Sequence, residues 1–128
     1  MKNVCWLMIM LLCIAGTAMG ASVDPIMTKA LSERLDNQEV QMLTVEYAPG
    51  ESSAAHRHNA HTFVYVLEGS VEMQVAGGDP VTLTAGETFY ESPDDVHSLS
   101  RNASGDQRAK FLVFFVKEAG APATVPAQ

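Results

Sequence analysis

Three of the four histidines of the chain, His56, His58 and His61, lie in one short stretch, and the fourth, His97, lies much further along. On an extended strand, residues two apart point to the same face. His56 and His58 would therefore present two imidazoles to one side. His97, at the start of a later expected strand, could complete three nitrogen ligands. Neutral imidazoles bind Fe, Mn, Ni, Zn and Cu, so the pattern indicates one divalent transition metal of undetermined identity.

A pair of histidines two residues apart has a second interpretation. It is also compatible with two solvated surface side chains that bind nothing. His61 has the opposite parity to His56 and His58, so we expect it to point to the other face of the strand. Only a β-bulge after His58 would turn it inward as a further ligand.

The region that must position these histidines has the composition of short strands. Turns rich in Gly, Pro and Asp separate β-forming segments, and residues 70–75 alternate apolar and polar side chains, as in a strand with one buried face. The predicted strands cover residues 40–47, 62–67, 70–75, 81–84, 88–91, 96–100 and 109–117. This pattern, with almost no helix, predicts a single all-β domain, a sandwich or barrel, over residues 39–117.

The last predicted strand, residues 109–117 (AKFLVFFVK), is apolar on both faces. A strand with one solvated face should alternate instead. We therefore expect its second face to be covered, either by the N-terminal segment or by a second subunit, and the latter predicts a homodimer.

The two ends of the chain lie outside this domain. Residues 1–20 have a charged start, a short apolar run and small residues at a cleavage site, which predicts a signal peptide and a periplasmic or secreted protein. An uncleaved anchor is the alternative. Residues 21–38 are expected to form an N-terminal arm or short helix, and residues 118–128 a C-terminal tail outside the core. Both cysteines, Cys5 and Cys13, fall in the signal peptide, so a metal site would use nitrogen and oxygen ligands.

The formal net charge is −7, and no basic stripe is present. This excludes nucleic acid as an expected partner. A small molecule is the expected partner instead, and no membrane contact is expected after signal cleavage. The acidity is better interpreted as a contribution to solubility than as a functional feature.

The histidine stretch resembles the first motif of the cupin superfamily, as found in small single-domain bacterial members. The first motif is matched by Gly50, by His56 and His58 after five intervening residues, and by the closing Gly69. The second motif is matched by Gly86 and His97. The resemblance covers about residues 40–116 and implies a double-stranded β-helix, or jelly-roll barrel, with the histidines facing inward. The second motif departs from the family at its Pro and Gly positions.

One departure concerns a ligand. Thr62 stands where the family has a glutamate ligand, and counting by twos from His58 places Thr62 on the inward face. A site of three histidines without that carboxylate keeps open positions on the metal. One of Phe89 and Tyr90 should face the interior. Glu87 and Glu91 are both expected at the surface.

Three functions are compatible with the sequence. The first is a metal-dependent oxidoreductase, dioxygenase-like, acting on a small organic substrate, since an Fe, Mn or Ni site with open positions can activate O2 or polarise a chelating substrate. The second is a non-catalytic small-molecule-binding or sensing module, with or without metal, which the missing glutamate favours. The third is a structural dimer with an inert cavity. The cupin fold hosts many functions, so the resemblance alone does not choose between them.

Overall fold

The computed structural model describes residues 37–127 of the chain. The predicted signal peptide (1–20) and all but the last two residues of the predicted arm (21–38) lie outside the described residues. In the described part, every regular element is a β-strand, which confirms the all-β prediction. No helix in this part of the chain is long and apolar enough to cross a membrane.

The strands agree closely with the segments expected from the sequence. Three of them, β5, β6 and β7, have the predicted bounds, and the remaining long ones differ by up to two residues at either end. The strands are β1 (Gln38–Tyr47), β2 (Ser52–Ser53), β3 (His56–Arg57), β4 (Ala60–Glu68), β5 (Ser70–Val75), β6 (Val81–Thr84), β7 (Thr88–Glu91), β8 (His97–Asn102), β9 (Ala109–Glu118) and β10 (Val125–Pro126).

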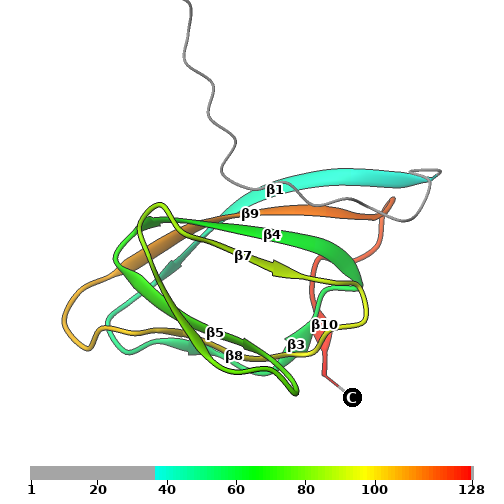
Figure 1. Ribbon diagram of the computed structural model, residues 1–128. Coiled ribbons are helices and arrows are strands. Elements are labelled where there is room, and N and C mark those ends of the chain that lie inside the picture. Colours follow the sequence, from blue (N-terminus) through cyan, green and yellow to red (C-terminus); the bar gives the residue numbers. More distant parts are fainter. Residues whose placement is uncertain (1–36, 128) are drawn as a thin grey trace, which may run out of the picture.

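Two antiparallel sheets face each other across the interior (Figure 1). The first has the order β1-β9-β4-β7, and the second has the order β10-β3-β8-β5-β6, with β2 also paired to β8. Apart from the hairpin of β5 and β6, neighbours in each sheet are not consecutive in sequence, which is the topology of a double-stranded β-helix. The predicted jelly-roll barrel needs one correction: among the described strands no pairing joins the two sheets, so the barrel is not closed. At one side, the edge strands that leave it open are β1 of the first sheet and the very short β2 and β10 of the second.

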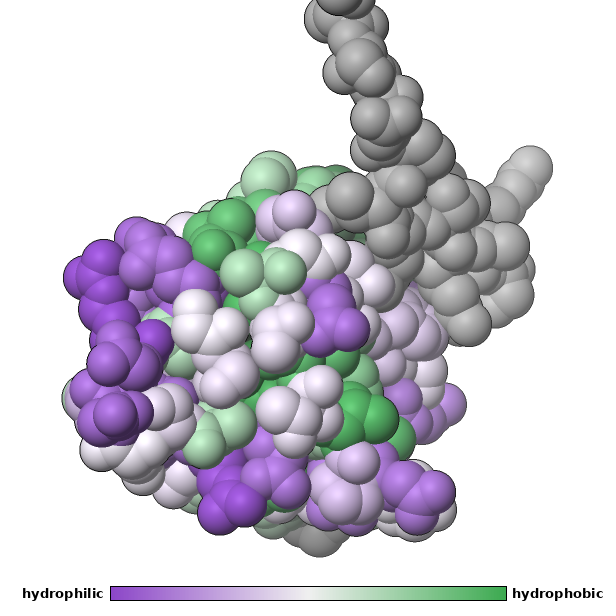
Figure 2. Space-filling view, turned by 60° about the vertical axis from the view of Figure 1, so that its left-hand side comes forward, coloured by the Kyte–Doolittle hydropathy of each residue, from purple (hydrophilic) through white to green (hydrophobic). Residues whose placement is uncertain are grey.

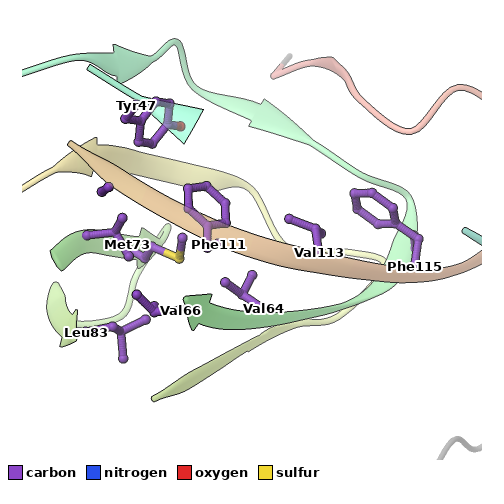
Figure 3. Packing of buried hydrophobic residues seen from close by; sticks show 11 residues of the cluster. Tyr47, Val64, Val66, Met73, Leu83, Phe111, Val113 and Phe115 are labelled. Atoms are coloured by element: carbon purple, nitrogen blue, oxygen red, sulfur yellow. The ribbon is translucent and has the colours of Figure 1, made fainter. Parts of the chain in front are cut away.

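The core consists of the inward-facing residues of both sheets. In β5, Val71 and Met73 are fully buried, as their alternation with polar neighbours predicts. On β9, three inward side chains, Phe111, Val113 and Phe115, follow one another along the strand (Figure 3). This apolar row leads from one end of the interior to the other.

The outer face of the first sheet is also apolar. Phe114 on β9 lies beside Phe63 on β4, with ring centroids 6.0 Å apart, and Val40 and Met42 on β1 are 57% and 59% exposed. On the side of the molecule drawn in Figure 2, hydrophobic residues reach the surface beside strongly hydrophilic ones. The expectation that β9 is apolar on both faces is confirmed, and the homodimer that would cover its outer face stays a prediction.

The tight turn between β4 and β5 depends on Gly69. Its φ is +72°, and a Cβ added there would lie 2.4 Å from the carbonyl oxygen of Arg108. We expect Gly69→Ala to lower the free energy of unfolding by about 2–4 kcal/mol, because it combines a strained φ with a backbone clash. Gly50→Ala, with the same sign of φ but open space around it, should cost only about 1 kcal/mol. Urea denaturation of both variants checks this, and equal losses would show that the close approach is unimportant.

Candidate metal centre

The three histidines predicted as ligands come together in the interior. His56 on β3 and His97 on β8 are directly opposite each other in an antiparallel pair, and His58 follows His56 by two residues. One ring nitrogen of each histidine lies within 4.8 Å of the others. The convergence expected from strand parity is therefore present, and metal binding by these residues stays a prediction.

Backbone carbonyls fix the proton positions of two of the rings. His56 Nδ1 lies 2.7 Å from the Ala54 carbonyl oxygen, and His58 Nδ1 lies 2.7 Å from the Ala123 carbonyl oxygen. A carbonyl only accepts, so each Nδ1–H donates, and in the neutral ring Nε2 then carries a lone pair. Both lone pairs face each other, because the two Nε2 atoms are 3.2 Å apart. Two neutral imidazoles held in this way repel each other unless a proton or a metal cation lies between them, and backbone partners of this kind are typical of metal-bound histidines.

Glu91 adds a carboxyl group that the sequence interpretation placed wrongly. Only 1% of Glu91 is exposed. One carboxyl oxygen, Oε1, lies 3.3 Å from His97 Nδ1, and the other, Oε2, lies 3.9 Å from His58 Nε2. The expectation of a surface carboxylate is therefore wrong, and the cluster consists of three imidazoles and one carboxyl group.

The pairing of β7 with β4 explains this position. Glu91 is the cross-strand partner of Thr62, and Phe89 is the partner of Val64, so these four side chains all face the interior. Thr62 is fully buried, as predicted, and its cross-strand neighbour supplies a carboxyl group close to where the cupin motif has one. The sequence signal was the parity of Phe89: once that ring packs against the core, Glu91 must face inward too.

The protonation states of this cluster follow from its burial. Without a bound cation, desolvation raises the pKa of Glu91 to about 8, and the charge of Asp95 adds to the rise. Burial, together with the neighbouring His56 and His58, lowers the pKa of His97 to about 4. At neutral pH the Glu91–His97 contact is thus between an uncharged acid and an uncharged imidazole. Glu91 Oε1 and both ring nitrogens of His97 make no hydrogen bond of good geometry among the described residues, which is costly for buried groups and suits residues that bind a cation.

These pKa shifts predict how the stability of the metal-free protein depends on pH. Glu91 ionises near pH 4.5 in the unfolded chain but only near pH 8 in the folded chain. Between these values the folded state binds more protons than the unfolded state, so the free energy of unfolding falls as the pH rises. The lowered pKa of His97 acts in the opposite direction, but only below its usual value of 6.5. Between pH 6.5 and 8 only the Glu91 effect remains. We expect a loss on the order of 2 kcal/mol in that window.

Urea denaturation in the presence of a chelator measures this loss, with Glu91→Gln as the comparison, since Gln does not ionise. The wild-type protein should lose stability between pH 6.5 and 8 while the variant changes much less. Parallel curves for the two proteins would mean that Glu91 is already ionised in the folded state.

The cluster lies at one end of an internal cavity of about 520 Å³, a volume within the range of small-molecule sites. The rest of the wall is mostly apolar and includes Leu43 and Val45 from β1 and the inward row of β9. Residues 53–56, from the opposite sheet edge, also line it. The cavity therefore extends along the open seam between the two sheets.

The C-terminal segment forms part of this site, although the sequence predicts a tail outside the core. In β10, Val125 and Pro126 pair with Arg57 and His56 of β3, and residues 124–126 line the cavity. The buried Lys117 holds the segment by donating to the carbonyl of Ala121. Further along the same segment, the carbonyl oxygen of Ala123 accepts from His58 Nδ1 and so orients the His58 ring.

Removal of this segment should weaken metal binding. A chain truncated after Gly120 loses the acceptor of the His58 Nδ1 proton, and outer partners of this kind contribute about 10–100-fold in metal affinity. Competition against a coloured chelator measures the affinity. A chain truncated after Pro126 keeps β10 and the Ala123 carbonyl, so it should bind like the full chain. Equal affinity for both truncations would contradict the orienting role.

His61 lies outside the cluster, on the outer face of β4, as its parity predicts. It is nevertheless buried, with 8% of its surface exposed, and its Nδ1 lies 2.7 Å from the hydroxyl of Tyr90. Tyr90 therefore points outward, and Phe89 is the aromatic residue that faces the interior. His61 is a structural histidine of the outer face, separated from the other three by the sheet itself.

Comparisons with known proteins agree with this architecture. The family model of the cupin domain matches residues 43–115, and no curated protein matches the chain. A DMSP lyase from Ruegeria pomeroyi has a TM-score of 0.61 at 19% identity, with 69% of this chain and 43% of that chain covered. An RmlC-like cupin from Shewanella frigidimarina has a TM-score of 0.56 at 22% identity, with 64% and 69% covered.

An oxalate oxidase in complex with glycolate has a TM-score of 0.57 at 19% identity, and 84% of this chain and 66% of that chain are covered. The chain thus spans less than half the length of the lyase and about two thirds of that of the oxidase. At these identities the structures show a shared fold and leave the reaction open.

Proposed function

The chain belongs to the cupin domain family, and we propose that it is a metal-dependent member in which His56, His58 and His97, together with Glu91, hold one divalent transition metal. The proposed activity is that of an oxidoreductase, dioxygenase-like, acting on a small organic molecule in the cavity. Fe, Mn, Ni, Zn and Cu all suit the nitrogen and oxygen donors, and the first three suit the proposed chemistry best.

The observation that carries the proposal is the contact between two lone-pair nitrogens beside a buried carboxyl group. Two atoms bound to the same metal at about 2.0–2.2 Å lie roughly 3–4 Å apart. The distance between the Nε2 atoms of His56 and His58, 3.2 Å, falls in this range. So do the distances from Glu91 to His97 and to His58, 3.3 and 3.9 Å. The donor types suit a divalent cation, and the widest separation among the histidine nitrogens, within 4.8 Å, would have to shorten slightly on binding.

Glu91 would set the charge of the site. Three neutral imidazoles leave both charges of a divalent metal uncompensated, whereas an ionised Glu91 leaves one. The same carboxyl group holds a proton in the metal-free protein, so binding of a cation should displace that proton. The remaining positions face a largely apolar cavity, where electrostatic interactions are stronger than in bulk water.

When bound, a metal with open positions supplies Lewis acidity or activation of small molecules such as O2. The residues of this chain contribute the orientation of the ligands and the apolar wall of the cavity. Two of the similar structures are named as enzymes, a DMSP lyase and an oxalate oxidase, and both names are compatible with chemistry on small organic molecules.

Oxygen consumption tests the catalytic part of the proposal. Protein loaded with Fe, Mn or Ni is incubated with small enols and aromatic diols in an oxygen electrode cell, with His97→Ala as the background. We expect uptake above that background with at least one substrate class. Ligand binding that alters the spectrum of the metal without any oxygen uptake would favour the alternative, a non-catalytic binding or sensing module.

The cellular location of the protein is a separate proposal. The residues that predict secretion lie in 1–20, and we propose a periplasmic or secreted protein on the strength of that segment alone. Fractionation of cells that express the full chain tests it: mature protein starting at Ala21 in the periplasm or medium is the expected result, and uncleaved protein in the cytoplasm would contradict it.

A further inference from the structure

The cavity has a second polar end, formed by three hydroxyl groups. The hydroxyl oxygen of Tyr47 lies 2.5 Å from Ser53 Oγ and 2.8 Å from Ser100 Oγ. All three residues line the cavity. They come from β1, β2 and β8, so this hydroxyl cluster bridges the edges of the two sheets at the open seam.

The hydroxyl cluster has one proton more than its internal hydrogen bonds use. Three hydroxyl groups carry three O–H donors, and two hydrogen bonds connect them. No other hydrogen bond of these hydroxyls occurs among the described residues. Whatever the direction of the two bonds, one O–H group has no acceptor among the described residues. Because the three residues line the cavity, this group can donate to a molecule there, in competition with water at the exposed Ser53.

An apolar wall separates the hydroxyl cluster from the metal centre. The Tyr47 ring lies 5.5 Å from the Phe111 ring, and the His58 ring lies 4.9 Å from the Phe115 ring. Phe111 and Phe115 are four residues apart on β9, which corresponds to about 13 Å. Figure 3 shows Tyr47 and Phe115 at opposite ends of the row, with Val113 between them.

Within residues 37–127, no lysine or arginine lines the cavity. A carboxylate or phosphate at the hydroxyl end would therefore lie in an apolar cavity without a cation to pair with it, which is costly. The chemistry of that end suits an uncharged acceptor, such as a carbonyl, nitro or hydroxyl oxygen.

We propose that Tyr47, Ser53 and Ser100 form a substrate-binding subsite that donates a hydrogen bond to an uncharged acceptor at the far end of the substrate. The substrate class is then a compact, largely apolar molecule, with a chelating pair of oxygens at the metal end and a single acceptor at the other. This inference rests on the proposed metal site and deepens it, because it names the shape and the two polar ends of the substrate.

Two catechols test the subsite. 4-Nitrocatechol carries a chelating diol and an acceptor opposite it, whereas catechol lacks the acceptor. Their dissociation constants from zinc-loaded protein are measured by absorbance and by competition. The ratio of the two constants is compared between the wild type and Tyr47→Phe/Ser53→Ala/Ser100→Ala. The effect of the nitro group on the diol itself is the same in both proteins, so it cancels in this comparison.

We expect the preference for 4-nitrocatechol to fall about 5–10-fold in the triple variant, which corresponds to one hydrogen bond. Removal of all three hydroxyls leaves no unpaired partner, so the fold should tolerate it. The single change Tyr47→Phe leaves the O–H groups of Ser53 and Ser100 in place, so we expect it to change the ratio much less than the triple variant does. Ser98→Ala serves as the matched control, since Ser98 Oγ donates to the Gln74 carbonyl away from the cavity.

An unchanged ratio in variants that still hold one zinc per chain would overturn the subsite and leave the metal site intact. Absence of zinc from the loaded wild-type protein would instead refute the proposed function itself. Metal analysis of every sample separates these two outcomes.

Discussion

His97→Ala is expected to abolish metal retention, whereas His61→Ala should leave it intact. His97 is 3% exposed and lies opposite His56, so its loss removes one of three imidazoles that face a common point. His61 is also buried but lies on the other side of β4, in contact with Tyr90. Each substitution therefore removes a buried imidazole, but only the loss of His97 is expected to lower the amount of metal bound per chain.

Elemental analysis of the purified variants, after reloading with Zn, Mn or Fe and gel filtration, measures the metal per chain. We expect well under about 0.1 equivalents for His97→Ala and about one equivalent for His61→Ala. Thermal unfolding with and without metal provides a second readout, because a ligand that binds only the folded state raises the midpoint. Retained metal in His97→Ala would contradict the assignment of the ligands.

Glu91→Gln is expected to weaken metal binding by on the order of 100-fold, at the upper end of what polar partners of a metal site contribute. The substitution preserves the shape of the side chain and removes the negative charge that Glu91 would carry beside His97 and His58 when a metal is bound. Because Glu91 is protonated at pH 7 without metal, metal binding to the wild type should also release about one proton more than binding to the variant.

Calorimetric titration in buffers of different ionisation enthalpy measures both the affinity and the released protons. Glu87→Gln is the matched control: it makes the same charge change on an exposed side chain that bonds to Thr84. We expect the control to bind like the wild type. Equal affinities of the two variants would mean that Glu91 neither binds nor balances the metal.

Local patterns in the sequence predict most of the fold. Alternation in residues 70–75 and the turns at Gly69 and Gly86 specify β5 and its neighbours, because a strand with one buried face admits only one register. The parity of His56, His58 and Thr62 likewise predicts that they share the inward face. These predictions succeed because each rests on residues close together in the chain.

Glu91 and β10 could not be predicted in the same way. The strand β7 has two adjacent aromatic residues, so its parity is ambiguous until pairing with β4 turns Phe89 and Glu91 inward. The strand β10 has two residues, one of them Pro126, and only its pairing with β3 identifies it. Both features depend on contacts between distant segments. They complete the site: one supplies its carboxyl group, and the other places the carbonyl that orients His58.

The most direct test of the central claim is the metal content of the wild-type protein, produced without an affinity tag that binds metal and purified without chelator. The proposed centre of His56, His58, His97 and Glu91 predicts close to one equivalent of a single transition metal per chain, either as purified or after reloading. A content well under about 0.2 equivalents that does not rise on reloading with Fe, Mn, Ni, Zn or Cu would contradict the claim.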